Sequence, residues 1–139
     1  MQKEREILNA LMASAQPSRD IDAMIAVATD WRFGDHEEGD LTPKAMADKH
    51  GIEWLIERMK NSSTAMWRHI PEFTKNIDAA VSLMSELIRC EFGSYGDMEN
   101  SWAYVNFRHN GTEYYANSEN LPNHSMAILA AYFGALLGK

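Results

Sequence analysis

The chain has 139 residues, of which 45% are apolar, and it carries a formal net charge of −7 at pH 7. This length and composition predict one globular domain over residues 1–139 and exclude general disorder. Neither half of the sequence is net basic, so a surface that neutralises nucleic-acid phosphates is not expected. Cys90 is the single cysteine, which rules out an internal disulfide and favours a reducing compartment. The charged start MQKEREIL is unlike a signal peptide, so export is not expected.

The first part of the chain, residues 1–61, is predicted to be all helical. Apolar residues recur at helical spacing over residues 3–15 and again after Ser18 and Thr42. Both side chains can cap the free amides of a helix, and Pro43 suits a first helical turn.

Two polar stretches and a glycine are predicted to interrupt these helices. WRFGDHEEGDLTP, residues 31–43, is rich in glycine and acids and is typical of a loop. Gly51 is expected to divide the next helix into a short and a longer one. NSST, residues 61–64, is the predicted boundary to a mixed α/β part over residues 65–139.

A sharp corner follows this boundary. WRHIPEF, residues 67–73, is predicted to be extended because a residue that precedes proline is pushed out of the helical region. Thr74 is predicted to cap a helix over residues 74–89. Two interpretations stay open at this point. The corner serves the fold alone, or its amides face a ligand together with Asp78, close to His69.

A β-hairpin near residues 101–117 is the clearest signal in the second part. Two β-prone runs flank Asn110-Gly111, the pair that type I′ turns prefer because both positions need positive φ. The upstream stretch CEFGSYGDM, residues 90–98, is predicted to add a strand or an irregular edge. The smaller side chains of the first hairpin strand should face the core, namely Ala103, Val105 and Phe107.

The opposite face of that strand carries Trp102, Tyr104 and Arg108, with Tyr114 or Tyr115 across the hairpin. An uncovered face of this kind would suit a planar ligand or a protein partner. The alternative is that a helix covers it, as in a three-layer sandwich.

MAILAAYFGALL, residues 126–137, is continuously apolar but too short to cross a bilayer, so a buried helix that starts at Asn120 or Pro122 is predicted. A ridge of small residues should bring this helix close to the sheet or to the predicted 74–89 helix. The whole pattern predicts an α+β fold in which a small antiparallel sheet lies between helices.

No catalytic or metal-binding motif is present. The five histidines lack metal-ligand spacing, and glycine-rich phosphate loops and serine elbows are absent, so no metal or cofactor is predicted. Cys90, at the end of a predicted apolar helix face, is typical of a small core residue. An enzyme would have to use His69 or His109 together with a carboxylate.

Three stretches resemble the phage and prophage ABA-sandwich domain family. RDIDAMIAVATDWR is similar to the LDALIAEKVMGW type of opening of that family, and IPEFTKNIDAA is similar to its VPxYSTDIxAA segment. HSMAILAAYFGALLGK is similar to its alanine-rich last helix. The matching positions in the first two stretches are Asp22, Ile25, Trp31, Pro71, Phe73, Thr74, Ile77, Asp78 and Ala80. Phe73 replaces the usual tyrosine, Lys75 and Asn76 replace a small polar pair, and residues 32–66 form an insert particular to this chain.

The resemblance implies a small phage-encoded protein of the bacterial cytoplasm whose family has no defined activity. We therefore expect a non-enzymatic accessory protein that binds a host protein or a small ligand. A small hydrolase and a virion structural or assembly protein are the alternatives. The candidate binding residues are Trp102, Tyr104, Arg108, Tyr114, His69, Thr74 and Asp78. Four tryptophans and five tyrosines exceed the needs of one interior, so a homodimer is also predicted.

Overall fold

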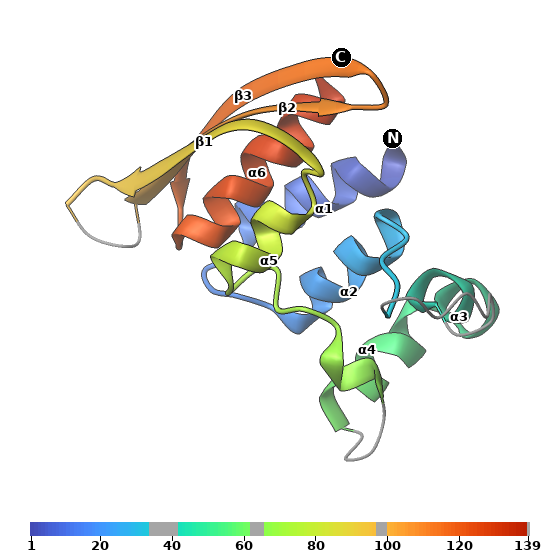
Figure 1. The fold of residues 1–139 in the computed structure, drawn as a ribbon. Coiled ribbons are helices and arrows are strands. Elements are labelled where there is room, and N and C mark those ends of the chain that lie inside the picture. Colours follow the sequence, from blue (N-terminus) through green and yellow to red (C-terminus); the bar gives the residue numbers. More distant parts are fainter. Residues whose placement is uncertain (34–41, 62–65, 97–99, 139) are drawn as a thin grey trace.

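The computed structural model describes residues 1–33, 42–61, 66–96 and 100–138 (Figure 1). Most of the predicted 31–43 loop and of the 61–64 boundary lies outside these residues. In the described part, four helices precede a mixed segment of helices and strands. The predicted α+β class, with its helical first half, is confirmed.

The first four helices follow their predicted caps. They are α1 (Gln2–Ala13), α2 (Arg19–Ala28), α3 (Pro43–His50) and α4 (Ile52–Asn61). The Ser18 side chain accepts a hydrogen bond from the Ile21 amide, and Thr42 accepts one from the Ala45 amide. Gly51 separates α3 from α4 with a φ of 92°, a conformation that favours glycine.

The second part begins with a 3₁₀ helix, η2 (Met66–His69), and the short helix α5 (Ile77–Ser82). Three strands and a last helix complete it: β1 (Glu86–Ser94), β2 (Ser101–His109), β3 (Thr112–Leu121) and α6 (His124–Leu137). The strands form one antiparallel sheet in the order β1-β2-β3. The predicted turn is confirmed, with φ of 52° at Asn110 and 80° at Gly111.

Three predictions for residues 67–89 are wrong. Residues Met66–His69 form a 3₁₀ turn instead of an extended segment, and the predicted 74–89 helix ends at Ser82. Asn76, not Thr74, caps α5 by accepting a hydrogen bond from the Ala79 amide. Residues 86–89 pair with β2 and belong to β1 instead, where a register shift between Leu87 and Arg89 interrupts the two-residue alternation of the strand.

Helix α6 is the centre of the core. It packs across all three strands on one side and against α1 and α5 elsewhere, so most of its side chains are buried (Figure 1). The predicted inward residues Ala103, Val105 and Phe107 are fully buried beneath it. No helix in the described ranges is both long enough and apolar enough to span a bilayer.

One detail of the predicted fold needs correction. The sheet was expected between helices, but Figure 1 shows no described helix over the face of β2 that is opposite α6. Trp102, Tyr104 and Asn106 on that face are only half-buried. The sheet and α6 therefore form a two-layer arrangement at this end of the molecule.

Candidate functional site

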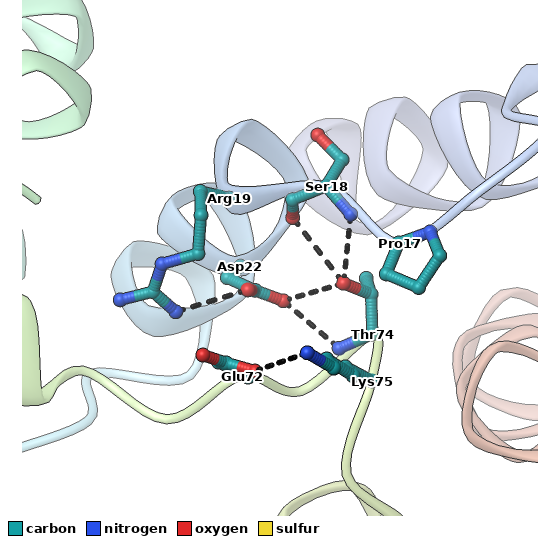
Figure 2. A pocket seen from close by; sticks show the side chains of 7 residues that line it. All are labelled: Pro17, Ser18, Arg19, Asp22, Glu72, Thr74 and Lys75. Atoms are coloured by element: carbon teal, nitrogen blue, oxygen red, sulfur yellow. Dashed lines mark hydrogen bonds and ion pairs between the residues drawn. The ribbon is translucent and has the colours of Figure 1, made fainter. Parts of the chain in front are cut away.

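The corner at Thr74 is built around a buried carboxylate. Asp22 in α2 is only 1% exposed, and its Oδ1 accepts hydrogen bonds from the amide and the hydroxyl of Thr74, both at 2.9 Å (Figure 2). The Arg19 Nη1 donates to Asp22 Oδ2 at 3.0 Å. The Ser18 amide donates to Thr74 Oγ1 at 3.0 Å. We call these four residues the Asp22 joint.

The joint ties three separate segments together. Besides its ion pair, the Arg19 guanidinium donates to the backbone carbonyls of Arg68, Ile70 and Pro71 at 2.9 to 3.4 Å. The carbonyl of Thr74 accepts a hydrogen bond from the side chain of Asn123, which caps α6. The start of α2, the 68–74 segment and the start of α6 thus share one hydrogen-bond network.

This network favours the structural interpretation of the corner. A pocket of about 300 Å³ lies beside it, with Glu72 and Lys75 at its exposed rim. The inner polar groups, however, already bond to one another, which leaves them occupied in the folded protein. The predicted site residues are not gathered here either, because Thr74 is fully buried while His69 and Asp78 are exposed and outside the joint.

The pH dependence of stability tests the electrostatics of the joint. Burial raises the pKa of Asp22 above its ordinary value, although the Thr74 and Arg19 bonds oppose this effect. The folded protein then holds this proton more tightly than the unfolded chain does. We expect the stability of the native protein, relative to Asp22→Asn, to fall as pH rises from the ordinary carboxyl pKa through the raised one.

Urea unfolding of both proteins at a series of acidic pH values measures this difference. A native protein that instead gains stability over Asp22→Asn with rising pH would show that Arg19 and Thr74 outweigh burial.

The uncovered side of the sheet is the second candidate site. The cross-strand register places Arg89 and Glu91 of β1 and Tyr115 and Asn117 of β3 beside Tyr104 and its neighbours on β2. We call this side the open sheet face. A shallow hollow of about 370 Å³ lies on this face. The residues that line it are Arg89, Glu91, Tyr95, Trp102, Tyr104 and Asn117.

Trp102 is held in place on this face. Gly93 pairs with it across the β1–β2 ladder, and the indole ring lies so close that a Cβ at residue 93 would be 3.0 Å away. The centroid of the exposed Tyr95 ring is 6.4 Å from that of the indole. Glycine at this position therefore lets the large ring lie flat on the neighbouring strand.

The prediction that Tyr114 belongs to the open sheet face is wrong. Tyr114 pairs with Phe107 and stacks on its ring at 5.5 Å, on the side that faces α6. Tyr115 pairs with Asn106 and is 65% exposed on the open sheet face. The sequence left Tyr114 and Tyr115 as alternatives, and the register selects Tyr115. Trp102, Tyr104 and Arg108 lie on the predicted face.

The third site is a cavity of about 490 Å³. Of its lining residues, sequence reasoning singled out His109, as a possible catalytic group, and Tyr114, as a member of the strand face. The cavity lies where α1, the end of α2, the hairpin turn and α6 approach one another. We call it the Tyr132 cavity. Its polar lining includes Glu4, Asp30, His109, Tyr114 and Tyr132. These residues are far apart in the sequence, so no local motif could have revealed them.

The histidines give little support to a hydrolase. His69 and His109 are both exposed, and this exposure counts against a buried general base, although His109 also lines the Tyr132 cavity. Within the described ranges, no group of three or more histidine, cysteine or acidic side chains is arranged to hold a metal ion.

Comparison with family models, curated proteins and solved structures finds no match to this chain. The resemblance to the ABA-sandwich family therefore stays an expectation drawn from the sequence.

Proposed function

We propose that this chain is a non-enzymatic phage or prophage accessory protein that binds a host protein in the bacterial cytoplasm through its open sheet face. One observation carries the proposal: Trp102, Tyr104 and Tyr115 gather on a sheet surface that no described helix covers. Tryptophan and tyrosine dominate the binding energy of protein interfaces, and a surface that presents several of them suits a partner.

The shape and charge of the open sheet face favour a protein over other partners. Small ligands are usually enclosed by concave sites, whereas this hollow is shallow and wide. Nucleic acid requires net positive charge, but Arg89 forms an ion pair with Glu91 of the same strand, and Arg108 lies opposite Glu113 of β3. Charges of both signs around an aromatic centre are typical of protein interfaces.

The loss of the Trp102 ring tests the proposal. We expect Trp102→Ala to weaken binding of the partner by about thirtyfold or more, because a central aromatic residue contributes about 2 kcal/mol or more. The fold should persist, since the indole is only half-buried and lies outside the α6 core. Met12→Ala on α1 is the control, because Met12 is also an exposed large apolar residue.

The partner is first identified with a photocrosslinking amino acid at position 115 or position 12 in bacterial cells. It is then purified, and its Kd is measured with the native protein and both variants. Equal cross-linking from both positions, or equal affinity for Trp102→Ala, would contradict the proposal. A second copy of the chain as the main product would replace the host protein by the predicted homodimer.

A further inference from the structure

The Tyr132 cavity has an apolar side and a polar side. Its apolar side is formed by Leu83, Phe133 and Leu136, together with the aromatic rings of Tyr114 and Tyr132. The Tyr132 ring is fixed by contacts with Phe107 at 5.0 Å and with Phe133 at 4.9 Å between centroids. Its volume of about 490 Å³ is in the range of small-molecule sites.

A polar atom at this cavity lacks a partner within the described part of the chain. The Glu4 Oε2 is buried and accepts no hydrogen bond there. The Tyr132 side chain, which also lines the cavity, is only 4% exposed. Buried polar atoms without partners are rare in folded proteins because each one costs free energy. A bound molecule that supplies a donor would remove this cost.

The Glu4 carboxylate and the Tyr132 hydroxyl are close enough to interact. Burial raises the pKa of the Tyr132 hydroxyl, and the nearby negative charge of Glu4 raises it further. The hydroxyl therefore stays protonated and neutral at physiological pH. Glu4 reaches the cavity from α1 and Tyr132 from α6, so their meeting depends on the packing of these two helices.

Glu4 sets the charge that the cavity favours in its ligand. The lining contains two acids and no lysine or arginine, and its other ionisable groups, apart from the tyrosines, are the Met1 amino group and His109. Asp30 is already paired with Arg32 at 3.0 Å. Its φ of 50° belongs to the end of α2, where the Trp31 amide bonds to the Ala26 carbonyl. Glu4 is thus the carboxylate available to a ligand.

We propose that the Tyr132 cavity binds a small organic amine with an apolar body. Its ammonium group would donate to Glu4 and lie near the faces of the Tyr114 and Tyr132 rings, while the apolar body contacts Leu83, Phe133 and Leu136. A carboxylate ligand is disfavoured because it would meet Glu4 as a like charge. This site is separate from the open sheet face, and it does not depend on the function proposed for that face.

Three probes of similar shape and different charge test the class of ligand: 2-phenylethylamine, 2-phenylethanol and phenylacetate. Each is titrated into the ¹⁵N-labelled protein, and amide shifts are followed by NMR at neutral pH. We expect saturable shifts around residues 132–136 and residue 4 with the amine. The amine should bind at least about tenfold more tightly than the alcohol, and phenylacetate should bind most weakly.

Two variants that each remove one negative charge from α1 test whether the ammonium group of the ligand binds to Glu4. Glu4→Gln should weaken amine binding by about tenfold or more, whereas Glu6→Gln removes an exposed acid from the same helix and should leave the affinity unchanged. Tyr132→Phe keeps the ring packing and should weaken binding to a smaller extent. The proposal is wrong if none of the probes gives saturable shifts, if phenylacetate binds as well as the amine, or if both glutamate variants lose equal affinity.

Discussion

Replacing Asp22 by alanine is expected to lower the free energy of unfolding by about 3 to 5 kcal/mol, as when one partner of a buried ion pair is removed. The Asp22 carboxylate is 1% exposed and receives three hydrogen bonds, two from Thr74 and one from Arg19. Its loss would leave the buried Thr74 amide without its acceptor. Because Arg19 is partly exposed and can be hydrated, we expect the lower end of this range.

Asp20→Ala is the matched control for this experiment. Asp20 lies in the same turn of α2, but its side chain is more than half exposed and pairs with Lys60 at the surface. Such a pair contributes about 1 kcal/mol or less. Urea unfolding of both variants gives the two free energies. If the two substitutions cost the same, the Asp22 joint does not hold α2 to the 68–74 segment.

Local chemistry was enough to predict much of this fold. Ser18 and Thr42 cap their helices by accepting hydrogen bonds from amides of the first turn. Asn110-Gly111 forms the hairpin turn because both residues adopt positive φ. The alternation of Ala103, Val105 and Phe107 with larger polar or aromatic residues identified the buried side of β2. Each of these signals is complete within a few residues of the sequence.

Features that depend on distant partners could not be predicted in this way. Residues 86–89 continue an apolar helical pattern, and pairing with β2 turns them into a strand. Thr74 resembles a helix cap, but its hydroxyl bonds to Asp22, a residue 52 positions away. The only local hint was an acid between the apolar residues Ile21 and Ala23, both buried in the structure.

The candidate sites also differ in whether local sequence or distant packing forms them. Trp102, Tyr104 and Arg108 were found because one strand carries them in alternation. Glu4 and Tyr132 meet only after α1 packs against α6, and no spacing in the sequence relates them. A cavity between packed helices is thus a property of tertiary structure, whereas a strand face can be predicted from the sequence.

The two faces of β2 should differ greatly in their sensitivity to truncation. We expect Phe107→Ala to lower the free energy of unfolding by about 3 to 5 kcal/mol, because this ring is fully buried and its removal leaves a cavity. It stacks on Tyr114 and contacts Tyr132, so it joins the sheet to α6. Tyr104→Ala on the open sheet face should cost about 1 kcal/mol or less, the size of a cross-strand contact.

Both variants remove an aromatic ring from the same strand, so strand propensity and chain position are closely matched. Urea unfolding monitored by circular dichroism gives both values and shows whether the slope of the transition is preserved. A Tyr104 variant that loses as much stability as the Phe107 variant would mean that another layer covers the open sheet face. The three-layer sandwich would then be correct, and Trp102 could not contact a partner without a rearrangement of the fold.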